Sequence, residues 1–345
     1  MTFARVFIIV AVGALASCGP GQANAATPDS ESVPSAQCWT QEALAGTLKE
    51  LKSTRSGPRL DLEALKQESL PTPVSIAEDL RGSIRSVELP PGQKLIALTF
   101  DLCESDGDHA GYDGRVVDLL RAEGVKATFF AGGKWLESHP ERAQQLIADA
   151  NFEIGAHGLR HRDLTHASDK TMAEEIGLTE AAFVRARKAF VARACATNLG
   201  TAASVPQERI TLMRFPYGRC NAKSLAAVAA AGQLAIQWDV VTGDPDPHIT
   251  AKGIAKTILT RAHPGAIIVA HANGRGRNSA AALALALPKL REQGYSFATV
   301  SELLAAGKPV IAATCYLNRP GDATRVARTK QRRKPNDIWS VLRSR

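Results

Sequence analysis

Two histidines four residues apart, His157 and His161, carry the first sign of chemistry in this sequence. On one helical turn their imidazoles would face the same way, so together they could bind a single metal ion. The pair is weak evidence when taken alone, because histidines at this spacing are more often ordinary surface or core residues. Its meaning therefore depends on which other polar residues the fold brings near it.

Three further side chains of suitable types stand beside short apolar runs. Asp101 ends Leu-Thr-Phe-Asp, Arg214 opens Arg-Phe-Pro-Tyr-Gly, and His271 ends Ile-Ile-Val-Ala-His. Each has a simple structural explanation, as a helix cap, a salt-bridge partner and a barrel-rim residue respectively. Finding all three in one chain with the histidine pair is hard to attribute to chance. A carboxylate, a guanidinium and an imidazole in one site are suited to general acid–base catalysis.

Apolar runs that could form buried strands alternate along the chain with stretches of helical periodicity. The runs cover 95–100, 127–131, 152–156, 211–215, 234–241, 266–270 and 296–300, and the helical stretches cover 113–123, 140–150, 170–192, 222–232, 251–262 and 280–293. Strand–helix alternation with continuously apolar strands predicts an α/β fold, in which helices cover a parallel sheet. About seven such units favour a barrel over a small open sheet.

The candidate polar residues share one position relative to these predicted strands. Asp101, His157, Arg214, Asp244 and His271 each lie at or shortly after the end of an apolar run. In barrels of parallel strands the active site is built at the carboxyl ends of the strands. We therefore expect these five side chains to gather at one mouth of the barrel.

With these motifs the chain resembles the polysaccharide deacetylase family, whose shared unit is the NodB homology domain of carbohydrate esterase family 4. The resemblance covers about residues 94–305 and follows the family order of Thr-Phe-Asp-Asp, His-x-x-x-His, Arg-x-Pro-Tyr, an Asp-Trp motif and Leu-x-Leu-x-His. It implies a distorted (β/α) barrel and metal-dependent removal of acetyl groups from an acetylated polysaccharide.

The resemblance also implies roles for the residues near the metal. His157 and His161 would bind the ion together with Asp101, which would also be the general base. Arg214 would orient Asp101, and the backbone N–H of Tyr217 would face the oxyanion. Zinc is the ion that suits these ligands best, and cobalt, nickel or iron would fit the same set.

The remaining motifs supply the acid and the substrate groove in the family. His271 would be the general acid, and Asp244, which falls six residues after Trp238, would tune it. Such an acid needs a raised pKa to stay protonated at neutral pH, which a neighbouring carboxylate can provide. Trp238 and Tyr217 would wall the groove that binds the sugar.

Two departures from the family pattern bear on the metal site. The second Asp of the first motif, a ligand in the family, is Leu102 here, and the Trp of the fourth motif is Pro245. A leucine cannot bind a cation, so the third ligand has to come from Asp101, Glu104 or Asp113. For Asp113 the ordinary explanation is strong, because it stands where a helix N-cap belongs.

The sequence thus predicts a metal-dependent deacetylase acting on N-acetyl or O-acetyl groups of a polysaccharide. One rival is a glycan-binding protein whose barrel lost catalysis at Leu102. Another is a hydrolase of a non-glycan amide on the same scaffold. No serine-hydrolase, P-loop or dinucleotide-binding motif is present in the sequence to support those classes.

The N-terminus reads as an export signal. Arg5 precedes an apolar run at 6–16 that is too short for a membrane-spanning helix. Ala23-Asn24-Ala25 would release a soluble protein, whereas the segment ending at Cys18 resembles a lipoprotein cleavage site that would leave a lipid anchor. Both alternatives place the protein in the periplasm or cell envelope, as a monomer whose partner is the acetylated polysaccharide.

An oxidising compartment permits disulfides between the cysteines that follow the signal. These lie at positions 38, 103, 195, 220 and 315, so one of them must be left over. We expect Cys195 to pair with Cys220 and Cys38 with Cys315, which leaves Cys103 free.

Composition and charge bound the remaining possibilities. With 345 residues, 45% hydrophobic and 22% charged, the chain is an ordinary globular protein and not a disordered or multi-span membrane protein. The net charge of +8 resides mostly in 319–345, which holds nine Lys/Arg and two Asp/Glu. The body is nearly neutral, so we expect no nucleic-acid partner.

We divide the chain into a signal segment at 1–25, a linker with a short helix and an extended wrap at 26–93, the catalytic domain at 94–315 and a basic tail at 316–345. The helix is expected within 39–52 and the extended wrap within 53–93. For the tail we expect solvated disorder, with docking onto an anionic polymer or membrane surface as the alternative.

Overall fold

The computed structural model describes residues 38–55, 57–197, 207–320 and 322. The signal segment and nearly all of the basic tail lie outside these residues, so the expectations for them remain predictions. Among the described residues no helix is both long and apolar enough to span a membrane.

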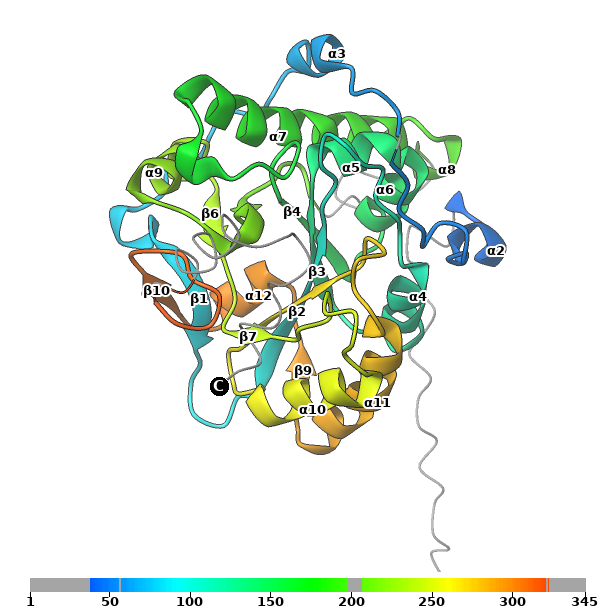
Figure 1. Ribbon diagram of the computed structural model, residues 1–345, viewed down its shortest axis with the longest axis vertical. Helices are drawn as coiled ribbons and strands as arrows, with labels where there is room; N and C mark the ends of the chain where they lie inside the picture. Colours follow the sequence, from blue (N-terminus) through cyan, green and yellow to red (C-terminus); the bar gives the residue numbers. More distant parts are fainter. Residues whose placement is uncertain (1–37, 56, 198–206, 321, 323–345) are drawn as a thin grey trace, which may run out of the picture. The chain divides into compact units, whose positions relative to one another are not determined.

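The described strands form one ten-stranded sheet (Figure 1). They are β1 (Ser83–Glu88), β2 (Leu95–Leu102), β3 (Ala127–Ala131), β4 (Phe152–Ala156), β5 (Leu212–Met213), β6 (Leu234–Ile236), β7 (Val240–Val241), β8 (Ile267–His271), β9 (Ser296–Phe297) and β10 (Lys308–Ala312). Their order is β10-β1-β6-β5-β4-β3-β2-β8-β7, with β9 pairing with β2. These pairings are parallel except for that between β1 and β10. The sheet curls as a distorted (β/α) barrel, which confirms the expected fold.

Helices connect successive strands and cover the outside of the sheet. The main ones are α4 (Gly114–Ala122), α5 (Gly133–Ser138), α6 (Pro140–Ile147), α7 (Asp169–Val191), α9 (Ala222–Ala230), α10 (Ala251–Arg261), α11 (Ser279–Glu292) and α12 (Val300–Ala305). Several begin at capping residues: the Ser168 side chain accepts the Thr171 N–H, and Asn221 forms a capping box with Ser224. In Figure 1, α10 and α11 lie side by side next to β7 and β9.

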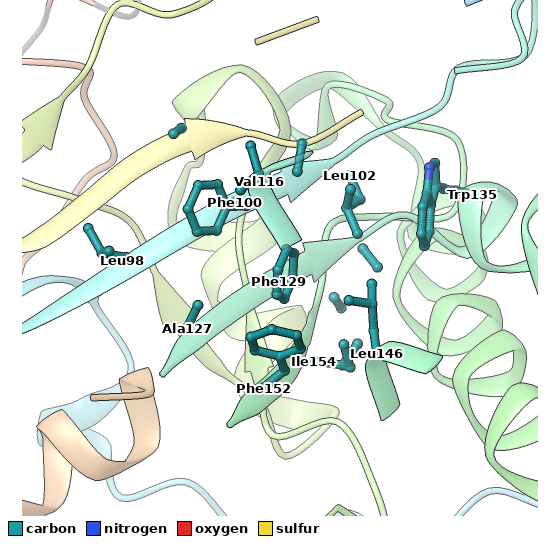
Figure 2. Packing of buried hydrophobic residues seen from close by; sticks show 14 of the residues in the cluster. Leu98, Phe100, Leu102, Val116, Ala127, Phe129, Trp135, Leu146, Phe152 and Ile154 are labelled. Carbon is teal, nitrogen blue, oxygen red and sulfur yellow. The ribbon is translucent and has the colours of Figure 1, made fainter. Parts of the chain in front are cut away.

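The two faces of β2 bury different sets of side chains. Leu98, Phe100 and Leu102 belong to the large core between the sheet and the outer helices, and Figure 2 shows Phe100 near Phe129 and Leu102 near Trp135. Residues one position away point to the inner face, where Ala97 belongs to the smaller core cluster. Successive side chains of a strand alternate between faces, so the inner face also receives Asp101.

Three expectations about elements need correction. The helix expected within 39–52 is only the single turn α2 (Gln41–Leu44). The extended wrap at 53–93 contains a short helix, α3 (Leu62–Lys66), and β1, which pairs with β6 and β10 inside the sheet. The apolar run 234–241 is not one strand, because it divides into β6 and β7.

The segment before the sheet is anchored by one arginine of α6. The Arg142 guanidinium donates to both carboxylate oxygens of Glu50, at 2.7 and 2.9 Å. It also donates to the backbone carbonyls of Ala43, Leu44 and Ala45. Five acceptors on one planar fork give the segment a defined position despite its short helix.

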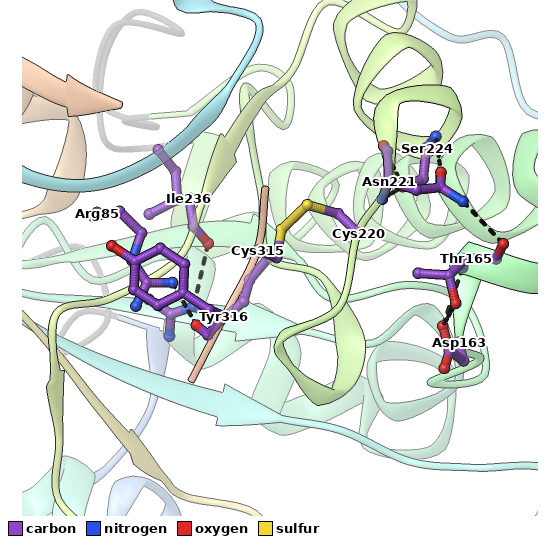
Figure 3. Close-up of a disulfide and its surroundings, with 10 residues drawn as sticks. Arg85, Asp163, Thr165, Cys220, Asn221, Ser224, Ile236, Cys315 and Tyr316 are labelled. Carbon is purple, nitrogen blue, oxygen red and sulfur yellow. Dashed lines mark hydrogen bonds between the residues drawn. A yellow bond between two sulfur atoms is a disulfide. The ribbon is translucent and has the colours of Figure 1, made fainter. Parts of the chain in front are cut away.

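The disulfides connect different cysteines from those we expected. Cys38 pairs with Cys195, and Cys220 pairs with Cys315, so both expected pairings are wrong. The expectation that Cys103 is unpaired is confirmed. Sequence proximity favoured joining Cys195 to Cys220, but in the fold Cys195 lies next to Cys38 and Cys220 lies next to Cys315. Figure 3 shows the Cys220–Cys315 bridge beside Tyr316.

Candidate active site

The polar residues chosen from the sequence converge at the carboxyl ends of the parallel strands. Asp101 lies on β2, His157 follows β4, and His271 ends β8. All three line one pocket of about 280 Å³, together with His161 and Asp244. The expected gathering at one mouth of the barrel is what the structure shows, because parallel strands bring their carboxyl ends to the same edge.

Asp101 and Arg214 form a buried ion pair on one side of this pocket. The Arg214 Nη1 atom donates to Asp101 Oδ1 at 2.8 Å. The arginine is fully buried, its Nη2 atom donates to the Gln237 carbonyl at 3.2 Å, and its guanidinium lies 3.9 Å from the ring centre of Phe130. Such a planar fork held on several sides orients its carboxylate partner rigidly.

The charges around Asp101 decide its protonation state. Burial by itself raises the pKa of the Asp101 carboxyl, since a charged group is disfavoured away from water. The neighbouring His157, Arg214 and His271 outweigh burial and leave that pKa below its usual value. Asp101 is therefore ionised at neutral pH and able to accept a proton.

Asp244 and His271 form a second pair in the same pocket, and His271 is the register partner of Asp101 on the neighbouring strand β8. The His271 Nδ1–H donates to Asp244 Oδ1 at 3.0 Å, and the His271 backbone N–H donates to Oδ2 at 2.7 Å. Thr242 and Ser279 hydroxyls donate to the same carboxylate. Burial lowers the pKa of His271, but the charge and hydrogen bond of Asp244 raise it to about 9. His271 thus stays protonated at neutral pH.

The histidine pair is carried by a loop and not by the helical turn that we assumed. Gly158 has φ of 75° and His161 has φ of 55°, a conformation that is uncommon for a residue with a side chain. This loop still brings the two imidazole rings to a centroid distance of 4.9 Å. The Nδ1 atom of His157 lies 2.8 Å from the Arg214 carbonyl, which can only accept, so the proton is on Nδ1. The Nε2 atom of His157 is left with its lone pair, the form that binds metal ions.

Aromatic residues form the rim and the wall of the pocket. Tyr217 stands in the turn Pro216–Gly218 with φ of 61°, its side chain is 42% exposed, and its ring lies 4.4 Å from that of His161. Trp238 lines the pocket from the segment between β6 and β7. These positions agree with the groove that we expected Trp238 and Tyr217 to form.

The rim also contains residues that sequence reasoning missed. Leu317 lines the pocket, and its carbonyl accepts a hydrogen bond from Trp238 Nε1 at 3.1 Å. The Arg85 guanidinium donates to the Tyr316 and Leu317 carbonyls and lies 3.7 Å from the Tyr316 ring centre (Figure 3). No motif marks this C-terminal segment, since only the fold returns it to the site.

Leu102, which replaces the second Asp of the first motif, and the nearby Glu104 both place their side chains outside the pocket. Leu102 is fully buried in the outer core, where Figure 2 shows it near Trp135. Glu104 accepts from the Ala110 N–H and the Ser138 hydroxyl and lies 3.4 Å from Lys134 Nζ. Neither Leu102 nor Glu104 lines the pocket that holds the histidine pair.

Asp113 is likewise committed elsewhere. It occupies the N-cap position of α4, as its ordinary explanation predicts, but its side chain makes no capping hydrogen bond. Both of its oxygens accept from Arg115 instead, at 2.8 and 2.9 Å. Among the three expected sources of a further ligand, only Asp101 faces the pocket.

A residue that we had set aside does face the pocket. Cys103 is 3% exposed and lines the pocket beside Asp101. Burial raises the pKa of its thiol, but interactions with His157, His271 and Arg275 lower that pKa overall. The alternation of side chains along β2 was the signal that could have identified Cys103, because positions 101 and 103 share a face.

Comparison with known proteins identifies relatives of this chain. A family model described as polysaccharide deacetylase matches residues 88–236. The chain is 31% identical over 222 residues to a peptidoglycan-N-acetylglucosamine deacetylase of Bacillus cereus, covering 63% of this chain and 91% of that protein. It is 30% identical over 226 residues to the deacetylase PgdA of Listeria monocytogenes, covering 65% of this chain and 42% of that one.

Solved structures share the fold. The Bc1960 peptidoglycan N-acetylglucosamine deacetylase superposes with a TM-score of 0.54 at 24% identity, over 67% of this chain and 96% of that one. BA3943 of Bacillus anthracis, described as a pseudoenzyme of family CE4, superposes with a TM-score of 0.52 at 23% identity, over 66% and 70%. At these identities the likeness concerns the barrel. With the Bacillus cereus relative matched over nearly its whole length, the chain belongs to the polysaccharide deacetylase family.

Proposed function

We propose that this protein is a metal-dependent hydrolase that removes acetyl groups from an acetylated polysaccharide. The observation that carries the proposal is that a base and an acid, each held by a partner of opposite charge, line one pocket. The ionised Asp101 is held by Arg214, and the protonated His271 is held by Asp244. A protein that only binds glycans has no need of an ionised base and a protonated acid in the same site.

His157 and His161 would bind the metal ion, and Asp101 would lie next to it. The donor chemistry fits, because His157 presents its Nε2 lone pair and Asp101 Oδ2 lies 3.5 Å from that atom. A divalent cation there would polarise the acetyl carbonyl and make water a nucleophile at neutral pH. Zinc is our first candidate, with cobalt, nickel or iron as alternatives.

The protein's own groups would handle the protons. Asp101 would accept the proton of the attacking water, and Arg214 would keep that carboxylate ionised and in place. His271 would donate its Nε2 proton to the departing sugar amine or alcohol, while Asp244 stabilises the imidazolium. The backbone N–H of Tyr217 would donate to the oxyanion from the turn at Pro216–Gly218.

An N-acetylated glucosamine polymer is the first substrate class to test, since the matched relatives are named for peptidoglycan N-acetylglucosamine. The exposed Tyr217 and the wall at Trp238 offer flat apolar faces for sugar rings. Export supports access to such a polymer, and the two disulfides are typical of an oxidising compartment. We propose an exported protein in either case, whether it is anchored to lipid at Cys18 or released in soluble form.

The test is acetate release by the purified protein from N- and O-acetylated glycans, with and without a chelator. We expect release that the chelator abolishes and zinc or cobalt restores. Asp101→Asn removes the base at nearly constant size, and general-base catalysis contributes about 10²- to 10⁴-fold, so its rate should fall by that factor. Release that is unaffected by both the chelator and Asp101→Asn would contradict the proposal.

The main rival is an inactive glycan-binding protein, which the apolar residue at Leu102 favours. Glycan binding without acetate release, at full metal occupancy, would establish that alternative. Acetate release from small amides but not from any glycan would instead favour a hydrolase of non-glycan amides.

A further inference from the structure

The loss of a carboxylate at Leu102 leaves the metal site of the proposed function short of a protein ligand. We infer that Cys103 supplies it, so that His157, His161 and the Cys103 sulfur form a His₂Cys metal site. The inference rests on the proposed function for its setting, but its evidence is the geometry of these three side chains.

The first step is the direction of the Cys103 side chain. Leu102 is buried in the outer core, and Cys103, the next residue, lines the inner pocket with Asp101. The Cys103 side chain, one residue after Leu102, therefore lies on the pocket side of the sheet, where the Leu102 side chain does not. The backbone does not need to move for the thiol to meet the pocket.

The second step is the distance between the donor atoms. One donor atom from each of Cys103, His157 and His161 lies within 4.8 Å of the others. Ligand atoms around a tetrahedral zinc ion are about 3.3–3.8 Å apart, given bonds of roughly 2.0–2.3 Å. Side-chain adjustments of about 1 Å would close the site, and the fourth position would face the pocket.

The third step is the support behind two of the ligands, His157 and Cys103. His157 is oriented by its Nδ1 hydrogen bond to the Arg214 carbonyl. The Asn273 amide donates to the Cys103 carbonyl at 2.7 Å and to its sulfur at 3.1 Å. Asn273 is fully buried. Hydrogen bonds of this kind hold metal ligands in place and stabilise the charge of a thiolate.

A second cluster in the described residues lacks these properties. Glu104, His109 and His139 also bring three donor atoms within 4.8 Å. However, Lys134 Nζ lies 3.4 Å from Glu104 Oε1 and balances its charge. The other oxygen, Glu104 Oε2, accepts from Ser138 and from a backbone N–H. A cation would have to displace the Lys134 ammonium from Glu104 Oε1, so we assign no metal ion to this cluster.

A sulfur ligand has consequences that a carboxylate would not have. Thiolates favour zinc and cobalt over harder cations such as magnesium or manganese. A thiolate bound to cobalt(II) also gives a charge-transfer absorption in the near ultraviolet that nitrogen and oxygen ligands do not give. The ligand can therefore be identified without measuring catalysis.

The experiment is cobalt titration of the full chain with its disulfides intact, followed by absorption and by metal content after dialysis. We expect one cobalt per chain and the charge-transfer band in the wild type. Cys103→Ser should lose the band and weaken metal binding by at least about 10-fold. Cys103→Asp should retain the metal without the band, and it also covers the case in which Cys103→Ser fails to fold. Asp113→Asn, a carboxylate committed to Arg115, is the control and should behave as wild type.

The outcomes separate this inference from the proposed function. One cobalt bound without a band, lost in His157→Ala but unaffected in Cys103→Ser, would overturn the sulfur ligand and leave a metal-dependent deacetylase intact. Absence of any bound metal, with acetate release that resists chelation, would overturn both.

Discussion

At the residue scale, the site is defined by pairs in which one side chain sets the state of another. Arg214 holds Asp101 in its ionised form, and Asp244 holds His271 in its protonated form. An ionised base and a protonated acid in one pocket are what a hydrolase needs in order to take a proton from water and give one to a leaving group.

Removing the Asp244 charge should move the alkaline limit of activity. The pKa of His271 is raised to about 9, so its acid form is present below that pH and lost above it. In Asp244→Asn this pKa falls, and the alkaline limb of kcat/KM should shift to lower pH. We expect the rate at pH 8 to drop by about 10- to 100-fold, which does not exceed the contribution of about 10²- to 10⁴-fold that a general acid makes. A pH–rate profile at equal metal content measures both effects.

Asp246→Asn provides the matched control for this experiment. Asp246 is a buried carboxylate two residues away that accepts from the His248 N–H and lines a different pocket. Its substitution should leave the alkaline limb unchanged. A profile for Asp244→Asn that coincides with the wild type would show that Asp244 does not set the pKa of His271.

At the element scale, the rim of the pocket depends on a segment that follows the last strand in the sequence and is held in place by a disulfide and by Arg85. The Cys220–Cys315 disulfide joins the loop before α9 to the segment that carries Leu317. Arg85 of β1 holds the same segment through two carbonyls. The position of the Trp238 wall therefore relies on contacts between elements far apart in the sequence.

Breaking this disulfide should loosen the pocket as well as the fold. The bridge closes 95 residues of sequence, and the chain-entropy model assigns about 4–5 kcal/mol to a loop of that size. The double variant Cys220→Ser, Cys315→Ser should lose up to that amount of unfolding free energy in denaturant. Its KM should rise more than its kcat falls, because Leu317 contributes to binding and not to proton transfer.

The other disulfide is the control for the effect on KM. Cys38 and Cys195 contribute no residue to the pocket, and their bridge closes 157 residues of sequence. Removing it should destabilise the protein by a similar amount and leave KM unchanged. Equal changes of KM in the two double variants would mean that the Cys220–Cys315 bridge has no specific effect on the rim.

At the scale of the described chain, the segment before the sheet is attached by an ion pair that depends on pH. Burial raises the pKa of Glu50, but the hydrogen bonds and charge of Arg142, with hydrogen bonds from Thr47, lower it from 4.5 to about 2. The pKa is depressed in the folded state, so the stabilisation is complete above pH 4.5. It is lost as the pH falls towards 2.

Glu50→Gln should therefore remove an acid-sensitive part of the stability. We expect a loss of roughly 1 kcal/mol of unfolding free energy at pH 7, allowing for solvent screening of a partly exposed group. The difference from wild type should vanish near pH 2. Denaturant unfolding at several pH values measures it, and Glu63→Gln, in an exposed pair with Lys66, should change stability by less than about 0.5 kcal/mol. A pH-independent difference would refute the assignment.

The sequence alone determined the barrel and most of the residues in its mouth. Strand and helix periodicity are local properties, and the carboxyl ends of parallel strands meet whatever the connecting loops do. This is why Asp101, His157, Arg214, Asp244 and His271 could be chosen before their distances were known. The same reasoning applied to β2 would have placed Cys103 beside Asp101.

Only the tertiary structure decided which distant segments meet. The pairing of Cys38 with Cys195 and of Cys220 with Cys315, the entry of β1 into the sheet and the approach of Leu317 to the pocket all join residues far apart in the chain. No local pattern encodes such contacts, because they result from how the completed barrel presents its surface to the rest of the chain. The direction of the Leu102 side chain was likewise not encoded locally, because it depends on packing within the outer core.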